Sequence, residues 1–171
     1  MKLYTLVLLL LTLITACNDD DLPDLLPPTT QTGANTFGCR VNGEVWVPEV
    51  DGFNEMAIDA LLSPNGTLNM QCRKEPISDD RNQTLQFSTV IDISGRETSP
   101  KYNFTYLRDR NVDGACRVIE LDTFTNHFVQ ITHIDSVNYT ISGRFEFQLK
   151  EDDCSTTVRV TEGRFDVTYR Q

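Results

Sequence analysis

The sequence predicts an all-β protein, either an antiparallel β-sandwich or a partly closed barrel of about 8–10 short strands. Three observations support this class. From Thr36 onward, apolar and polar residues alternate with a period of two, which is typical of half-buried strands. Turn-forming residues recur about every 8 to 12 residues, and no long segment has a clear helical period. The 171 residues are 39% hydrophobic, which is sufficient for one globular domain with a buried core.

The first two strands are expected to form a hairpin around Asn42-Gly43. This pair is a strong signal for a type I′ turn, because both central residues of that turn have positive φ. A two-residue loop places Val41 opposite Glu44 and Cys39 opposite Trp46. We therefore expect the indole of Trp46 to cover Cys39.

The next segment, Met56 to Leu62, fits either one face of a helix or a strand. The following Ser63-Pro64-Asn65-Gly66 favours the strand, because Pro at the second position and Gly at the fourth predict a type I turn with a glycine bulge. That turn leads into a strand with Leu68, Met70 and Cys72 on one face.

Alternation also indicates the later strands. A long strand is expected from Leu85 to Ile93, and Gly95 to Pro100 is expected to close it. The remaining strands are expected at Tyr102–Tyr106, Ala115–Leu121, Phe124–Ile131, Val137–Leu149 and Thr156–Tyr169. So many short strands, joined by turns, are typical of a sandwich or a barrel.

A Gly-Arg-Phe-acid pattern occurs twice, at Gly143–Glu146 and at Gly163–Asp166, twenty residues apart. In a hairpin the two copies would lie close to antiparallel register, with each Phe facing inward and each Arg and acid on the solvent face. Glycine within a strand indicates a bulge or a bend. We interpret the repeat as two similar strands of one amphipathic sheet, and we expect Glu146 and Asp166 to be exposed.

The N-terminus predicts export and lipid attachment. Lys2 precedes an apolar run from Leu3 to Ile14, which is shorter than the roughly 20 residues of a membrane span. The following Ile14-Thr15-Ala16-Cys17 resembles the lipobox of bacterial lipoproteins. Cleavage before Cys17 would expose an amino group and a thiol for acylation, and several acyl chains give stable attachment to a bilayer. Cys17 is therefore the predicted lipidation site.

These features divide the chain into three parts: a lipoprotein signal peptide over residues 1–16, a lipidated acidic and Pro-rich tether over 17–35, and a single β domain over 36–171. The acidic triplet Asp19-Asp20-Asp21 resembles the signal that directs some lipoproteins of Gram-negative bacteria to the cell surface. We expect an outer-membrane lipoprotein of such a bacterium, with surface exposure favoured over an orientation toward the periplasm. Its first partner would be the lipid bilayer, through acylated Cys17.

Two regions of the domain carry a resemblance. The segment Thr36–Pro48 has the pattern Phe-x-Cys-x-Val-Asn-Gly-x-x-Trp, and the two Gly-Arg-Phe-acid copies lie near the C-terminus. Together they resemble an uncharacterised family of small all-β bacterial lipoprotein domains. The resemblance implies an all-β fold and assigns no activity or catalytic residue.

Four cysteines remain besides Cys17, which is an even number in an exported domain. This predicts two disulfides. Three pairings exist, and we favour Cys39 with Cys72 and Cys116 with Cys154, because each pair could join neighbouring strands. No two of these cysteines are closer than 33 residues in the sequence, and this spacing disfavours a zinc site.

One loop matches a calcium-binding pattern. Asp109, Asn111 and Asp113, followed by Gly114 and Glu120, fit the sequence Asp-x-Asn-x-Asp-Gly-x5-Glu of an EF-hand loop. The flanking residues alternate like strands, whereas an EF-hand needs helices on both sides. The remaining candidates are a looser calcium site at the three Asp and Asn residues, or a plain Asx-rich turn. The sequence predicts no other cofactor.

A short motif suggests a modification. Asp135-Ser136-Val137 resembles the Asp-(Ser/Thr)-aliphatic acceptor of O-glycosylation on some exported bacterial proteins. Ser136 is the candidate acceptor. The alternative is an unmodified turn between two strands.

The net charge and the histidine count disfavour several classes of function. The formal net charge of −10 disfavours nucleic acid and anionic membrane surfaces as partners. The chain has two histidines, His127 and His133, and neither a nucleophile elbow nor a glycine-rich phosphate loop. We therefore favour a non-enzymatic binding or accessory module for an unknown glycan, peptide or protein.

The alternative function is a small hydrolase that acts on a polymer outside the cytoplasm. Such an enzyme would need a pair of carboxylates in a cleft. Candidates are Asp79, Asp80, Asp152 and Asp153. A carboxyl group with a raised pKa would discriminate the hydrolase from the binding module.

Overall fold

A computed structural model describes residues 25–50, 56–75, 82–91, 97–108, 120–121, 127–150 and 157–171, with the backbone alone for 97–108 and 120–121. These residues form ten strands and no helix, which confirms the predicted all-β class. The strands are β1 (Thr36–Val41), β2 (Glu44–Trp46), β3 (Ile58–Leu62), β4 (Thr67–Lys74), β5 (Gln83–Ile91), β6 (Glu97–Arg108), β7 (Glu120–Leu121), β8 (Phe128–Asp135), β9 (Thr140–Lys150) and β10 (Thr157–Thr168).

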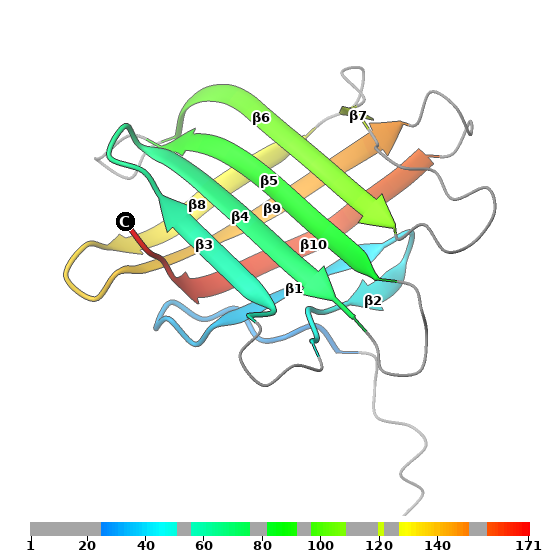
Figure 1. Ribbon diagram of the computed structural model, residues 1–171, viewed down its shortest axis with the longest axis horizontal. Helices are drawn as coiled ribbons and strands as arrows, with labels where there is room; N and C mark the ends of the chain where they lie inside the picture. The colour runs from blue at the N-terminus through cyan, green and yellow to red at the C-terminus, as the bar shows by residue number, and fades with distance from the viewer. Residues whose placement is uncertain are drawn as a thin grey trace, which may run out of the picture.

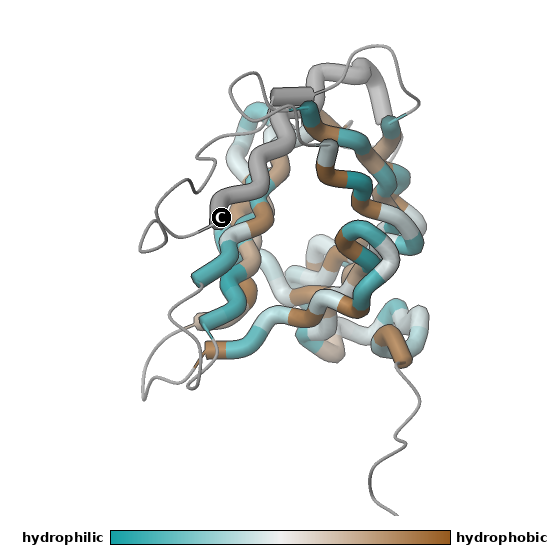
Figure 2. The backbone as a smooth tube through the Cα atoms, turned by 90° about the vertical axis from the view of Figure 1, so that its right-hand side faces the viewer, coloured by the Kyte–Doolittle hydropathy of each residue, from teal (hydrophilic) through white to brown (hydrophobic). Residues whose placement is uncertain are grey.

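The strands form two antiparallel sheets, which we name sheet A and sheet B. Sheet A has the order β2-β1-β10-β9-β7, and β8 also pairs with β9; sheet B has the order β3-β4-β5-β6. In Figure 1 sheet B lies in front, and its strands cross those of sheet A behind it. Figure 2 shows the two layers from the side. The fold is therefore a two-layer sandwich and not one closed barrel.

Aromatic side chains from both sheets fill the space between the layers. The ring of Phe145 in β9 packs against Phe37 at 5.0 Å and against Phe87 of sheet B at 5.3 Å between centroids. The predicted inward face of β4 is confirmed, because Leu68, Met70 and Cys72 are fully buried. Period-two alternation thus identified the residues of the core.

The predicted first hairpin is confirmed. Asn42 and Gly43 both have positive φ, 53° and 91°. Cys39 pairs with Trp46, and Val41 pairs with Glu44. Asn42 also fixes the turn against β10, because its Oδ1 accepts a hydrogen bond of 2.8 Å from the backbone N–H of Arg159.

The ambiguous segment before Ser63 is a strand, as favoured. β3 pairs with β4 along its length, from Ile58 opposite Cys72 to Leu62 opposite Leu68. In the turn, the N–H of Gly66 donates to the carbonyl of Ser63 at 2.9 Å, and Gly66 has a φ of 82°. Glycine is needed there because this backbone conformation is strained for other residues.

Three predicted boundaries were wrong. The segment expected to close the long strand instead begins β6 at Glu97 and includes Pro100. Proline is tolerated there because β6 is the edge strand of sheet B. β8 begins at Phe128 and continues to Asp135, and β9 begins at Thr140. Val137 is therefore not in a strand; it lies in the turn and is 84% exposed.

The register explains the repeated Gly-Arg-Phe pattern. Gly143 lies opposite Phe165, and Gly163 lies opposite Phe145, so each glycine faces the phenylalanine of the other copy. A Cβ added at Gly143 would lie 2.5 Å from Cζ of Phe165 and 2.6 Å from the carbonyl oxygen of Gln130. The two glycines leave room for two phenylalanine rings in the core, as cross-strand pairs of this kind do in other sheets.

This packing predicts that Gly143→Ala lowers the free energy of unfolding by about 1–3 kcal/mol through overpacking. Thr157→Ala is the control, because Thr157 is exposed at the end of β10. That control should change stability by less than about 0.5 kcal/mol. Urea denaturation of both variants tests the prediction. Equal stability of the two variants would show that Gly143 is not needed for the Phe165 packing.

Candidate functional site

An extended N-terminal segment, residues 25–35, lies against the outer face of sheet A; we name it the strap. At one end, a Cβ added at Gly38 in β1 would collide with Pro27. At the other end, Oδ1 of Asn35 accepts hydrogen bonds of 2.9 Å from both the N–H and the hydroxyl of Thr168. The strap therefore contacts β1 and β10 before the chain enters the first strand.

Asp166 of β10 holds the strap. Its carboxylate accepts hydrogen bonds from Thr30 Oγ1 (2.6 Å), Thr32 N (2.9 Å), Gly33 N (2.9 Å), Ala34 N (3.2 Å) and Ser142 Oγ (2.8 Å). The residue is 1% exposed. The expectation that Asp166 is exposed was therefore wrong. Its side chain does point to the outer face of the sheet, but the strap covers that part of the face.

The environment of Asp166 fixes its charge. Burial by itself raises the pKa, but hydrogen bonds from Thr30, Thr32 and Ser142 outweigh burial and hold the pKa of the carboxyl well below its usual range. The group is ionised at neutral pH, so it acts as a hydrogen-bond acceptor and not as a proton donor.

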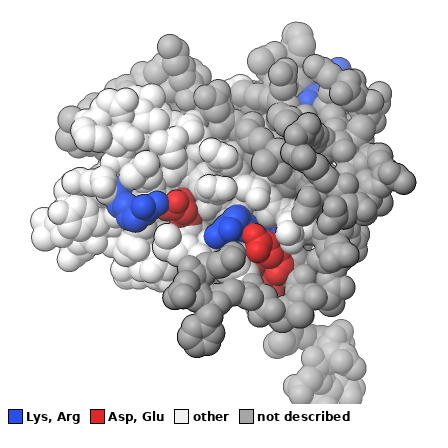
Figure 3. Space-filling view, viewed as in Figure 1, with Lys and Arg blue, Asp and Glu red and all other residues white. Residues whose placement is uncertain are grey.

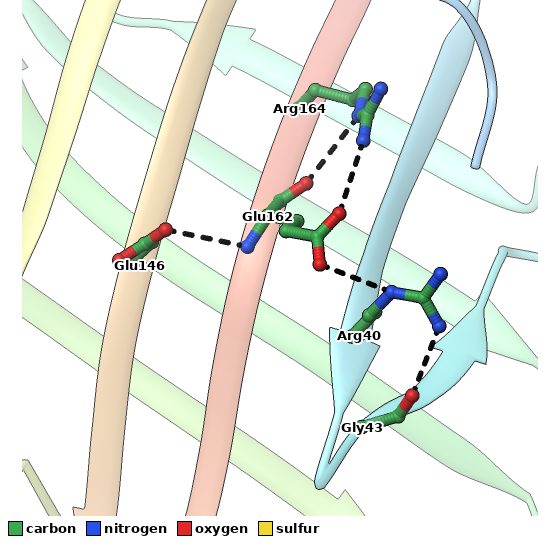
Figure 4. Close-up of polar contacts among 5 residues, drawn as sticks. All are labelled: Arg40, Gly43, Glu146, Glu162 and Arg164. Atoms are coloured by element: carbon green, nitrogen blue, oxygen red, sulfur yellow. Dashed lines mark hydrogen bonds and ion pairs between the residues drawn. The ribbon is translucent and has the colours of Figure 1, made fainter.

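Beside the strap, the outer face of sheet A carries the arginine cluster, which consists of Arg40, Arg144, Arg164, Glu146 and Glu162. Four of these side chains are drawn in Figure 4, with the strands of sheet B behind them. The Glu162 carboxylate lies between two arginines, 3.2 Å from Nε of Arg40 and 3.8 Å from Nη2 of Arg164. The N–H of Glu162 lies 3.5 Å from Oε1 of Glu146.

A double bulge places Glu162 between the two arginines. The register of β10 shifts between Val160 and Gly163, and the register of β1 shifts between Gly38 and Arg40. Glu162 has a φ of 54°, which is uncommon for a residue with a side chain. Bulges of this kind turn a side chain away from the regular alternation. Here the bulge brings one carboxylate to both guanidinium groups.

The outer face of sheet A is locally cationic in an acidic chain. Among the described side chains of β1, β9 and β10 it presents five cations, one exposed and one half-buried carboxylate, and Asp166 beneath the strap. The cations are Arg40, Arg144, Lys150, Arg159 and Arg164, and the carboxylates are Glu146 and Glu162. The net charge of the whole chain is −10. This separation of charge could not be predicted from the sequence, because it depends on the register of three strands.

The outer face of sheet B is different, as Figure 3 shows: its described surface is mostly uncharged. The charges near it are paired, Arg170 with Asp59 at 2.6 Å and Arg73 with Glu75 at 3.5 Å. In β4, Asn69 accepts a hydrogen bond of 2.7 Å from Ser88 of β5. The two faces of the sandwich therefore offer different chemistry to a ligand.

The two cysteines of the predicted Cys39–Cys72 disulfide are not bonded to each other in the structure, and the disulfide stays a prediction. Both residues are buried free thiols. Cys39 lies in β1 of sheet A and Cys72 in β4 of sheet B. Disulfides can join the two facing sheets of a sandwich, as in immunoglobulin domains, so this placement is compatible with the predicted pair. Burial raises the pKa of the Cys39 thiol to about 12, and burial also raises the pKa of Cys72.

These two thiols give a labelling prediction. In the native protein, a maleimide should label neither Cys39 nor Cys72, because both thiols are buried and the reagent attacks the thiolate. In denaturant without reductant, it should label both. Mass spectrometry of the two tryptic peptides measures the result. A disulfide-linked pair of these peptides would instead confirm the predicted Cys39–Cys72 disulfide.

Most other predicted site residues lie outside the described residues. These are Cys17, Cys116 and Cys154, the loop residues Asp109, Asn111 and Asp113, and the carboxylates Asp79, Asp80, Asp152 and Asp153. Glu120 starts β7, where only the backbone is described. Within the described part of the chain, no group of three or more His, Cys, Asp or Glu side chains is placed to hold a metal ion.

Ser136 lies at the exposed tip between β8 and β9. Asp135 shapes this tip, because its carboxylate accepts hydrogen bonds from the N–H of Val137 at 2.8 Å and from the N–H of Asn138 at 3.1 Å. The hydroxyl of Ser136 is therefore accessible for glycosylation, and its modification stays a prediction. The native protein should exceed its unmodified mass by a glycan, and Ser136→Ala should remove that excess.

Two carboxyl groups with described side chains have a clearly altered pKa, and both values are lowered. Asp166 is one; the other is Asp135, whose pKa is lowered mainly by the hydrogen bond from the Asn138 side chain. A general acid needs the opposite shift. The described residues therefore give the hydrolase alternative no support.

Comparisons with known proteins give no relative. No family model, no curated protein and no solved structure matches this chain. Among the described segments, none is a helix with the length and apolarity that crossing a bilayer requires.

Proposed function

We propose that the protein is an outer-membrane lipoprotein of a Gram-negative bacterium, acylated at Cys17, that works as a non-enzymatic binding or accessory module on the cell surface. Its ligand would be a glycan, peptide or protein. The lipobox and the acidic triplet support the anchor and the location. The second predicted disulfide, Cys116 with Cys154, belongs to the same proposal.

The strap is the structural observation that supports this proposal, because it fixes the chain to the sandwich close to the predicted acylation site. Asp166 fixes the chain at Thr30, only thirteen residues after Cys17. Thirteen residues span at most ~45 Å at about 3.5 Å per residue. An acyl anchor at Cys17 would therefore hold the sandwich close to the membrane through a fixed attachment at the outer face of sheet A.

The two faces favour binding over catalysis. Sheet A offers charged groups and sheet B offers amide and hydroxyl groups, such as Asn69 and Ser88. Such groups hold polar ligands by hydrogen bonds and ion pairs. The alternative, a hydrolase with a carboxylate pair, would need that pair in the residues outside the described ranges.

Mass spectrometry of the protein purified from cell membranes tests the anchor. The N-terminal peptide should begin at Cys17 and carry a diacylglyceryl group and an amide-linked acyl chain. Cys17→Ser should release the protein from the membrane fraction. A wild-type N-terminal peptide that begins at any other residue would refute the proposal.

Protease treatment of intact cells tests the location. A surface lipoprotein should be cleaved without lysis, and replacing Asp19-Asp20-Asp21 by Ser should protect it. Full protection of the wild type, with cleavage only after lysis, would show that the domain faces the periplasm.

A further inference from the structure

We propose that Arg144 and Arg164 on the outer face of sheet A form a binding site for a phosphate group. The site goes beyond the proposed function, because phosphate binding there does not depend on acylation of Cys17. It would give the module a defined ligand chemistry.

The register places two arginines directly opposite each other on neighbouring strands. Arg164 of β10 lies directly opposite Arg144 of β9. Both side chains point outward, since their neighbours Phe145 and Phe165 are buried. Like charges directly opposite each other destabilise a sheet. The guanidinium of Arg164 is turned toward Glu162, with Nε 3.4 Å from its carbonyl oxygen and Nη2 3.8 Å from its carboxylate. A bound anion would draw this group toward Arg144 and would remove the repulsion between the two arginines.

The carboxylates of the cluster do not neutralise Arg144. Glu162 lies between Arg40 and Arg164, and Oε1 of Glu146 is directed toward the N–H of Glu162. Arg144 itself is exposed and makes no ion pair or hydrogen bond within the described part of the chain. Its five N–H donors are therefore available to a ligand.

The neighbours of the pair define the extent of the site. On one side of Arg144, β8 places exposed Gln130 directly opposite it, which adds an amide group. On the other side of Arg164 lies Gly38, which has no side chain and is covered by Pro27 of the strap. The row across the four strands therefore has two cations in the middle, an amide at one end and the strap at the other.

Phosphate fits this row better than carboxylate. One guanidinium fork satisfies a planar carboxylate, whereas a tetrahedral phosphate has enough acceptor oxygens to bridge two forks. The phosphate group could belong to a small soluble ester or to the headgroups of a phospholipid membrane. The two sources share this chemistry, and the experiment below separates them.

The first arm uses the chain from residue 17 onward with Cys17→Ser, titrated with inorganic phosphate at low ionic strength. NMR signals of the arginine side chains should shift with a Kd on the order of 1–10 mM, as expected for a small exposed site. Arg144→Gln should weaken binding about tenfold, since a charge-assisted hydrogen-bonding group is lost. Arg170→Gln is the matched control, because it removes the same charge near sheet B and should leave the Kd unchanged.

A second pair of variants distinguishes phosphate binding at this site from a general effect of the net charge of the protein. Glu162→Gln releases Arg40 and Arg164 from their internal carboxylate and should tighten phosphate binding several-fold. Glu75→Gln makes the same charge change near sheet B and should have no effect. Equal effects of the two variants would overturn the proposal, because only net charge would then matter.

The third arm mixes the same chain with vesicles of neutral phosphatidylcholine, with and without phosphatidylglycerol. Binding to the anionic vesicles that needs Arg144 supports the site and identifies headgroups as the source. Phosphate binding without vesicle binding supports the site and identifies a small soluble phosphate ester. Binding of neither, or binding of both that Arg144→Gln leaves unchanged, overturns the proposal. Because Cys17 is absent, none of these results depends on lipidation.

Discussion

Asp166→Ala is expected to lower the free energy of unfolding by about 3–5 kcal/mol. The substitution removes one carboxylate that accepts six hydrogen bonds, and hydrogen bonds to a charged group contribute more than those between neutral groups. Asp59→Ala is the matched control. Asp59 forms an exposed ion pair with Arg170, and such pairs contribute about 0–1 kcal/mol. Urea denaturation of both variants measures the difference.

The effect of Asp166→Ala should depend on pH. The pKa of Asp166 is lowered in the folded protein, so its contribution to stability is complete above the unfolded pKa of about 3.9. That contribution is lost as the pH falls toward the folded pKa. The stability difference between the wild type and Asp166→Ala should therefore be constant near neutral pH and shrink below about pH 4. A difference that stays constant down to pH 2 would contradict the hydrogen-bonded, ionised carboxylate.

Trp46→Ala is expected to cost about 3–5 kcal/mol, because it leaves a large cavity at the junction of the two sheets. Trp46 is 3% exposed, and its ring meets the ring of Phe37 edge-on at 6.0 Å. Its Nε1–H donates a hydrogen bond of 2.7 Å to Oε1 of Gln83 in sheet B. Trp46→Phe keeps most of the packing and should cost less. Thermal unfolding of both variants tests the order of stability, and equal melting temperatures would contradict it.

The first hairpin shows what local sequence can predict. Asn42-Gly43 determines the turn type, the turn type determines the register, and the register puts Trp46 beside Cys39. Each step depends on neighbouring residues, so the prediction needs no knowledge of the remaining chain. The same holds for Ser63–Gly66 and for the alternating residues of β4 and β5.

The candidate site could not be predicted in the same way. The strap contains Thr, Gln, Gly and Asn, a composition typical of a linker, and its contacts depend on a carboxylate more than 130 residues away. The only local signal was the unusual pair of acids in the repeated pattern, Glu146 and Asp166. Register gave them different roles, because the strap covers one and leaves the other half-buried.

The positions of Cys39 and Cys72 also depend on long-range structure. An even count of cysteines and predicted strands nearby do not show whether two strands belong to the same sheet. Here the two strands lie in facing layers, which only the long-range pairing of β1 with β10 and of β4 with β5 establishes.

Hydrogen exchange at the amides of Thr32, Gly33 and Ala34 tests the central claim most directly, because the attachment of the strap depends on their bonds to Asp166. In the chain from residue 17 with Cys17→Ser, these three amides should exchange at least about tenfold more slowly than unprotected amides, since exchange requires the strap to open. Asp166→Ala should abolish this protection while the amides of β9 remain protected. Exchange of the three amides at the unprotected rate in the wild type would contradict the account.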